Sequence, residues 1–135
     1  MQEPLNSDSA SARPQGGPPA AAIGQDERTW GMLAHLSAFL GLIIPVLGNI
    51  LAPWAIWQGR RGRSPFVAEQ AKEALNFNIS VALGWLVCWI LRYAFIGVLF
   101  GIVLFICWLV LTIVAGVRAG EGMRYRYPVS LRFVK

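Results

Sequence analysis

The side chains that could carry chemistry in this chain of 135 residues are few. Its single histidine, His35, lies within an apolar stretch, where an ionisable group is a candidate for function by default. One imidazole cannot form a zinc site, and no recognisable set of nucleophile, base or metal ligands accompanies it. We therefore expect no catalytic residue, no metal and no cofactor. The simpler interpretation of His35 is a hydrogen bond to a neighbour such as Ser37 or Asn76 that holds helices together.

A second set of polar side chains follows Pro65. Four members recur at helical spacing and would lie within about 60° of one another on a helix: Glu69, Glu73, Asn76 and Ser80. Carboxylates and amides at the mouth of an apolar bundle must pair or face water, so this stripe could line a polar vestibule for an ion, a peptide or a partner. The alternative is a solvated first turn in which Glu69 pairs with Lys72. For Asn76 and Asn78 we expect hydrogen bonds between helices.

The composition indicates that these groups are positioned by membrane helices. Hydrophobic residues make up 56% of the chain and charged residues 14%, which is more apolar than a soluble domain. Two stretches, 29–58 and 93–117, contain no Asp, Glu, Lys or Arg, and each exceeds the roughly 20 residues that a spanning helix needs. The chain is therefore predicted to be an all-α integral membrane helical bundle.

The first apolar stretch is interrupted midway by Pro45, Gly48 and Asn49, and again by Pro53. Residues 30–57 could form one kinked helix, about 42 Å long at 1.5 Å per residue. We favour instead a hairpin of two short helices, whose turn would be covered by protein rather than lipid. Longer helices are expected over residues 66–91 and 94–117. This gives four membrane segments, or three if the first stretch is one helix.

The chain divides into three parts by composition. Residues 1–28 form a Pro/Ala/Gly-rich tail that is predicted to be disordered and lacks the basic start of a secretory signal peptide. Residues 29–120 form the helical membrane domain. Residues 121–135 form a basic, aromatic tail in which apolar and polar residues alternate from Met123, as in an extended segment. We expect it to lie along the anionic membrane surface or to pack against the loop around Arg60.

The net charge of +5 comes from basic residues that flank the apolar segments. Those expected on the cytoplasmic side are Arg60, Arg61, Arg63, Arg124 and Arg126. Lysine and arginine concentrate in the cytoplasmic loops of membrane proteins, so both termini are predicted to be cytoplasmic. No nucleic-acid-binding motif accompanies the charge, and we expect no nucleic-acid partner.

The segment from Ser64 to Ser80, SPFVAEQAKEALNFNIS, carries a family resemblance. Supporting blocks are Trp30 with His35-Leu36-Ser37, Ile44-Pro45 with Gly48-Asn49 and Pro53, and Tyr125-Arg126-Tyr127-Pro128 with Arg132-Phe133. Residues 27–135 thus resemble a bacterial family of small membrane proteins of unknown function, which is grouped with the twenty-kilodalton Tic component of the chloroplast inner-envelope import machinery. The resemblance implies four helices in the bacterial inner (plasma) membrane. Relatives often carry histidine at the position of Gln70. Because this chain has glutamine there, the resemblance does not imply a proton or metal role for this position.

These features favour a non-enzymatic accessory or assembly subunit of the inner membrane. Its partners would be the lipid bilayer and a membrane protein or a second copy of itself. The alternative function is a small homo-oligomeric channel or transporter, in which one set of polar residues lines a path through the bundle: His35, Asn49, Glu69, Glu73 and Asn76. Lys72 accompanies that set as a candidate interaction residue.

Overall fold

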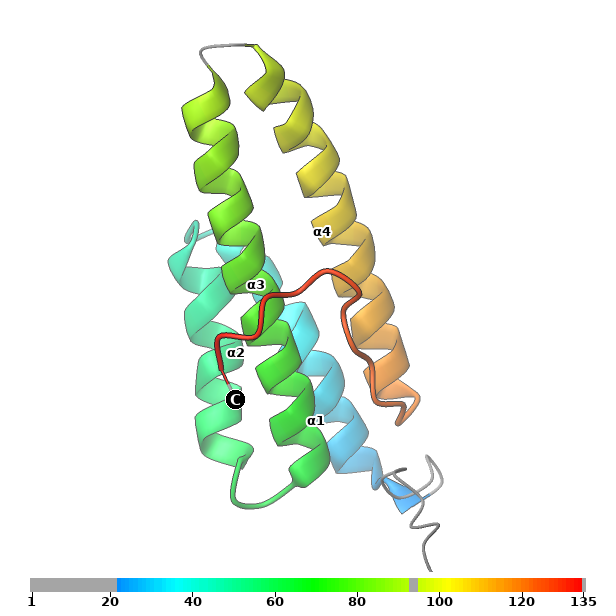
Figure 1. Ribbon diagram of the computed structural model, residues 1–135. Coiled ribbons are helices and arrows are strands. Elements are labelled where there is room, and N and C mark those ends of the chain that lie inside the picture. Colours follow the sequence, from blue (N-terminus) through cyan, green and yellow to red (C-terminus); the bar gives the residue numbers. More distant parts are fainter. Residues whose placement is uncertain (1–21, 93–94, 135) are drawn as a thin grey trace, which may run out of the picture.

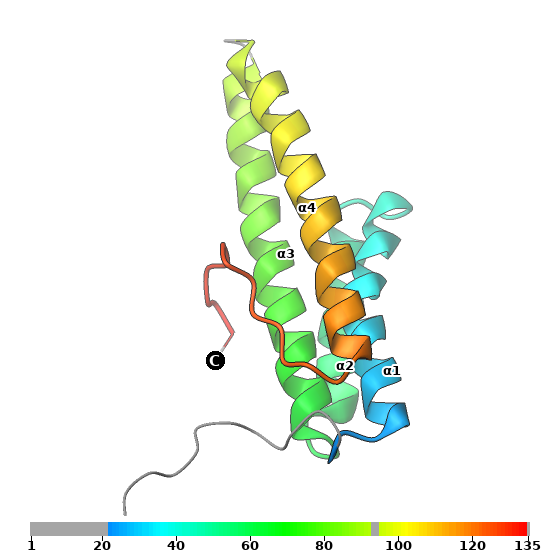
Figure 2. The same ribbon diagram turned by 90° about the vertical axis from the view of Figure 1, so that its right-hand side faces the viewer.

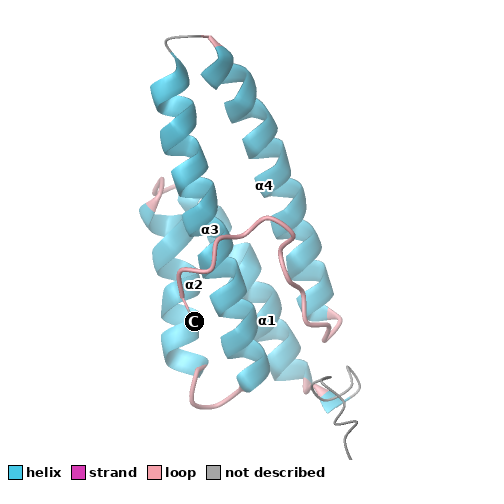
Figure 3. Cartoon of the chain, in the orientation of Figure 1, coloured by secondary structure: helices cyan, strands magenta, loops and turns pink. Residues whose placement is uncertain are grey.

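The computed structural model describes residues 22–92 and 95–134 of the chain, and these form helices joined by short turns (Figures 1 and 3). The elements are α1 (Gln25–Leu36), the 3-10 helix η2 (Ser37–Leu42), α2 (Leu47–Arg60), α3 (Pro65–Leu91) and α4 (Ile96–Gly120). The all-α prediction is confirmed for these residues. Most of the predicted disordered tail, residues 1–21, lies outside the described residues.

Two helices of the described chain, α3 and α4, are long and apolar enough to cross a membrane. They have 27 and 25 residues, whereas α1 has 12 and α2 has 14. The prediction of four membrane segments is therefore wrong in number, because neither arm of the first apolar stretch reaches the roughly 20 residues of a crossing. The two long helices extend beyond the other two and leave their far halves exposed and apolar (Figure 2).

The predicted hairpin in the first stretch is confirmed, since η2 and α2 pack side by side on either side of a turn at Ile43–Val46. The turn is not covered by protein as expected: Ile43 is 78% exposed and Ile44 is 56% exposed. Val46 has φ 65° and ψ −57°, close to a γ-turn, and the Leu47 N–H donates to the Pro45 carbonyl at 2.7 Å. Such a backbone is strained for a β-branched residue.

Glycine allows the hairpin arms to approach at backbone distance. A Cβ on Gly48 would lie 2.5 Å from the carbonyl oxygen of Leu40, and one on Gly41 would overlap the Asn49 side chain. Two glycines of α4 also make close contacts with other helices. Gly97 lies against the backbone of Cys88 in α3, and Gly116 lies against Leu36 of α1.

Four helix ends meet at one end of the bundle, at the bottom of Figure 1, and we call this the near end. Here α1 and α3 begin, and α2 and α4 end. Asp26 accepts from Arg60 at 3.2 Å, and Glu27 accepts a hydrogen bond from Ser64. Ser64 also caps α3, because its Oγ accepts from the Val67 N–H at 3.2 Å. These contacts join the start of α1 to the loop between α2 and α3.

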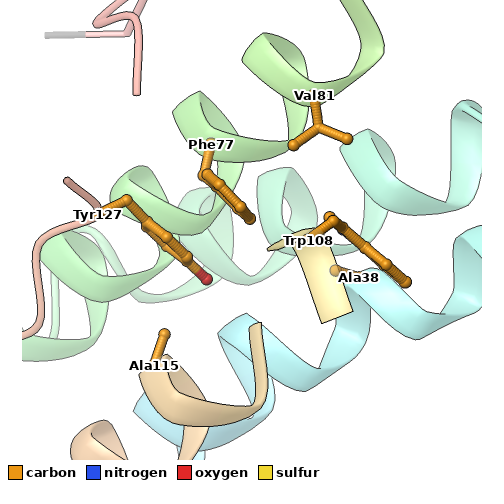
Figure 4. Packing of buried hydrophobic residues seen from close by; sticks show 6 residues of the cluster. All are labelled: Ala38, Phe77, Val81, Trp108, Ala115 and Tyr127. Carbon is orange, nitrogen blue, oxygen red and sulfur yellow. The ribbon is translucent and has the colours of Figure 1, made fainter. Parts of the chain in front are cut away.

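Beyond α4 the chain continues without helix over residues 121–134, which we call the C-terminal segment. It leaves the near end, runs along α4 and then crosses to α3 (Figure 1). Its Tyr127 enters the core and stacks on Phe77 of α3, with ring centroids 3.8 Å apart and planes 5° apart. Figure 4 shows Tyr127 in the same cluster as Ala115 of α4 and Ala38 of η2. The C-terminal segment therefore belongs to the bundle.

Replacing Gly48 with alanine is expected to lower the free energy of unfolding by about 1–3 kcal/mol, the usual cost of overpacking. The reason is that the new methyl group would meet the backbone of Leu40 and Gly41. Gly59→Ala in the same helix is the control, because nothing lies within 4 Å of its Cβ position. Thermal unfolding in detergent, followed by circular dichroism, compares the two variants. Equal melting temperatures would contradict the close approach.

Candidate functional site

Three buried side chains form a hydrogen-bonded network around His35. The imidazole Nδ1 lies 2.9 Å from the Tyr127 hydroxyl, and Nε2 lies 3.0 Å from Oε1 of Gln70. His35 and Gln70 are fully buried, and Tyr127 is 6% exposed. The network therefore joins α1, α3 and the C-terminal segment through side chains that water does not reach.

The hydrogen-bond partners fix the tautomer of His35. Oε1 of Gln70 also accepts from the backbone N–H of Tyr125 at 3.3 Å, and this N–H can only donate. The amide oxygen must therefore face both groups, so Nε2 of His35 carries the proton and donates to it. Nδ1 is then the acceptor for the Tyr127 hydroxyl. The assignment makes His35 a neutral imidazole with both nitrogen atoms satisfied.

The predicted polar stripe of α3 binds the backbone of the C-terminal segment. Asn76 makes three hydrogen bonds: its Oδ1 accepts from the N–H of Phe133 at 3.1 Å and of Val134 at 2.7 Å, and its Nδ2 donates to the Val134 carbonyl at 3.0 Å. Ser80 Oγ accepts from the Leu131 N–H at 2.7 Å. The stripe thus supplies the partners that an extended segment without a neighbouring strand would otherwise lack.

The acidic members of the stripe form ion pairs with the same segment. Glu73, which is 7% exposed, accepts from Arg132 at 3.2 Å. Glu69 pairs with Arg124 rather than with Lys72 as the solvated-turn interpretation supposed. Charge pairing and backbone hydrogen bonding therefore act on the same 14 residues of the chain, from Glu121 to Val134.

The structure brings together most of the residues proposed from the sequence. His35, Glu69, Glu73 and Asn76 all contact Gln70 or the C-terminal segment. Asn49 lies elsewhere, beside Gly41 in the hairpin, and its Oδ1 is buried without a partner in the described chain.

The basic residues of the near end have separate environments. The Arg60 guanidinium lies 3.9 Å from the centroid of the Trp30 ring, and that of Arg61 lies 5.6 Å from the centroid of Trp57. Arg63 and Arg126 are exposed, and Lys72 is partly exposed. The backbone of the tail follows α3, whose side chains accept its hydrogen bonds, and Arg126 of the tail lines one groove with Arg61 of the loop.

Sequence reasoning missed two members of the network. Gln70 was considered only as a difference from the relatives. Tyr127 was considered only as part of the alternating tail and of a block that carries the family resemblance. A usable signal was present, since a buried phenol requires a hydrogen-bond partner and the one histidine requires two. The expected interhelical bond of Asn78 is present, since its Oδ1 accepts from Trp108 Nε1 of α4 at 2.9 Å. The same expectation for Asn76 is wrong, because its partners lie in the non-helical C-terminal segment.

Among the described residues, no group of three His, Cys, Asp or Glu side chains could hold a metal ion. The arrangement is instead suited to binding a peptide backbone, because the amides of Gln70 and Asn76 and the hydroxyl of Ser80 form hydrogen bonds with backbone groups. The peptide that occupies it is the C-terminal segment of the same chain.

Comparison with known proteins gives one family. The model of the magnetosome magnetite crystal formation protein family, MamF and MmsF, matches residues 26–134. No curated protein and no solved structure matches the chain significantly. The match agrees with the expected small bacterial membrane protein family, and it gives no support for the resemblance to the Tic component.

Acidification should destabilise the fold through His35, which lies outside the two helices that are long and apolar enough to cross a membrane. Burial lowers the pKa of His35 from 6.5 to about 4, although its bond to Gln70 acts in the opposite direction. Between these values the unfolded chain binds the proton and the folded chain does not. Stability should therefore be constant above about pH 6.5 and fall as the pH is lowered towards 4. Melting temperatures in detergent measure this, and a slope that persists unchanged in His35→Asn would exclude His35 as its origin.

Removing the Asn76 side chain should release the C-terminal segment. Three hydrogen bonds at roughly 0.6 kcal/mol each correspond to about a ten- to twentyfold larger open population. The expected result for Asn76→Ala is a similar increase in the rate of tryptic cleavage after Arg126 and Arg132. Asn49→Ala is the control, because it removes an amide that has no contact with the segment. Equal cleavage rates in both variants would show that Asn76 does not hold the segment.

Proposed function

Because this chain belongs to the magnetosome magnetite crystal formation protein family, we propose that it is a non-enzymatic accessory subunit of a bacterial inner membrane. It would act by binding a membrane-protein partner through the exposed faces of α3 and α4. The near end would lie in the cytoplasm, so that both termini are cytoplasmic and the turn between α3 and α4 faces the opposite compartment.

The observation that supports this proposal best is that the polar side chains are bound within the chain. Gln70, Asn76 and Ser80 are hydrogen-bonded to the C-terminal segment, while Glu69 and Glu73 are paired with its arginines. A catalyst or a pore needs such groups free to meet a substrate or an ion. Here they stabilise a fold, and what remains exposed on the far halves of α3 and α4 is apolar.

The distribution of charge supports the same orientation. Basic residues gather at the near end, as is typical of the cytoplasmic side: Arg60, Arg61, Arg63, Arg118 and Arg124. The described carboxylates lie in the near half as well: Asp26, Glu27, Glu69, Glu73 and Glu121. At the far end of the described chain, Arg92 is the charged residue.

This distribution limits how the chain could take part in crystal formation. Hard metal cations prefer carboxylate oxygens as ligands. With the near end in the cytoplasm, no carboxylate of residues 22–92 and 95–134 would face the opposite compartment. We therefore place the contribution of this chain in the assembly of membrane partners and not in contact with the mineral.

Photocrosslinking in cells tests the proposal. A photoreactive amino acid replaces Trp89 of α3 or Phe100 of α4, which are 57% and 58% exposed, and Arg63 of the loop serves as the control position. We expect one discrete protein adduct from the helix positions, identified by mass spectrometry and reproduced when the photoreactive residue is placed in the captured partner.

Two outcomes would contradict the accessory role. Adducts containing only a second copy of this chain would favour the homo-oligomeric channel, which ion flux into liposomes would then test. The absence of any protein adduct from both helix positions would contradict the proposal that a membrane protein binds these faces of α3 and α4.

A further inference from the structure

A polar groove at the near end lies outside the network described above. It has a volume of about 460 Å³ and lies between the end of α2, the first turns of α3 and the C-terminal segment. Its lining includes Trp57, Arg61, Lys72, Arg126 and Arg132. Three separate elements thus direct cationic side chains towards one space.

The charges in this groove do not balance. Glu69 and Glu73 also line it, but they are paired with Arg124 and Arg132. Arg61, Lys72 and Arg126 have no carboxylate within salt-bridge distance in the part of the chain that the structure describes. Three cations around one groove repel each other unless an anion lies between them. The groove therefore has the charge of an anion-binding site.

The surroundings of the groove match a membrane interface. The indole of Trp57 lines it beneath the Arg61 guanidinium, and tryptophan is enriched at the headgroup level. The C-terminal segment that forms one wall continues into three exposed apolar side chains, Val129, Leu131 and Phe133, which are 72%, 57% and 53% exposed. A ligand with a phosphate group and an apolar body would satisfy both features.

We propose that this groove binds the phosphate headgroup of an anionic phospholipid of the cytoplasmic leaflet. Arg61, Lys72 and Arg126 contact the phosphate oxygens, as basic pockets between membrane helices do with anionic headgroups. The exposed apolar residues of the C-terminal segment contact the acyl chains. The inference rests on the proposed function only in placing the near end in the cytoplasm; it does not depend on the membrane-protein partner.

The site also gives the arginines of the C-terminal segment separate roles. The tail arginines divide into two groups: Arg124 and Arg132 pair with acidic residues of α3, whereas Arg126 lines the groove without a carboxylate partner in the described chain. The ion pairs of Arg124 and Arg132 hold the segment against α3, and this position of the segment brings Arg126 to the groove. Lipid binding and segment binding are therefore coupled, because a released segment would carry Arg126 away from Arg61 and Lys72.

Native mass spectrometry of the full chain in detergent tests the proposal. The chain is incubated with phosphatidylglycerol or with phosphatidylcholine, and the bound fractions are compared. We expect Arg61→Gln, Lys72→Gln and Arg126→Gln each to weaken phosphatidylglycerol binding about fivefold, the usual contribution of one basic residue near an anionic surface. Arg63→Gln is the matched control: it removes the same charge from the same loop, but Arg63 does not line the groove. The control should bind within about twofold of the parent chain.

Competition and crosslinking identify the source of the phosphate. Inorganic phosphate at millimolar concentration should not displace phosphatidylglycerol, and efficient displacement would overturn the lipid in favour of a free anion. A photoreactive phosphatidylglycerol in native membranes should label peptides of residues 61–72 and 121–135. Labelling confined to other regions, or equal losses in Arg63→Gln and the groove variants, would overturn the site even if a variant folded poorly. The protein crosslinks at Trp89 and Phe100 test the membrane-protein partner, so their failure would not change the outcome of the lipid-binding experiments.

Discussion

The fold depends on hydrogen bonds between side chains of α3 and the backbone of the C-terminal segment. A segment with no neighbouring strand and no helix of its own exposes one donor and one acceptor per residue, and each is costly to bury unpaired. Gln70, Asn76 and Ser80 supply partners at three levels along α3. In return the segment satisfies polar groups that an otherwise apolar helix could not carry into a bundle.

This mutual requirement divides the molecule into two halves. In the near half, buried polar groups join α1, α3 and the C-terminal segment, and ion pairs at Glu69 and Glu73 hold the segment. In the far half, α3 and α4 contact each other through small residues such as Gly97, and their outer faces are apolar and exposed. The near half carries the buried polar contacts, and the far half carries the exposed apolar surface.

Sequence periodicity predicted the helices and the polar stripe, but it did not predict contacts between residues that are far apart along the chain. The helices at 66–91 and 94–117 and the stripe of Glu69, Glu73, Asn76 and Ser80 follow from local spacing, and the structure has α3 at Pro65–Leu91 and α4 at Ile96–Gly120. The contacts of Asn76 and Ser80 lie 51 to 58 residues away and involve backbone groups, which every residue possesses. No side-chain pattern marks a backbone partner. The alternation after Met123 holds only as far as Tyr127, because the chain turns near Pro128 and the later apolar residues are exposed.

The short hairpin shows how an exposed turn can be tolerated beside apolar helices. An irregular backbone cannot lie in hydrocarbon while its polar groups are unpaired. In this turn the N–H groups of Ile43 and Ile44 both donate to the Leu40 carbonyl, and the Gly48 N–H donates to Ile44. Pro45 has no N–H to satisfy, and the strained Val46 closes the bond from Leu47 to Pro45. The unusual backbone of Val46 is thus the local cost of the bond from Leu47 to Pro45, and the turn pairs four of its backbone N–H groups although its side chains are exposed.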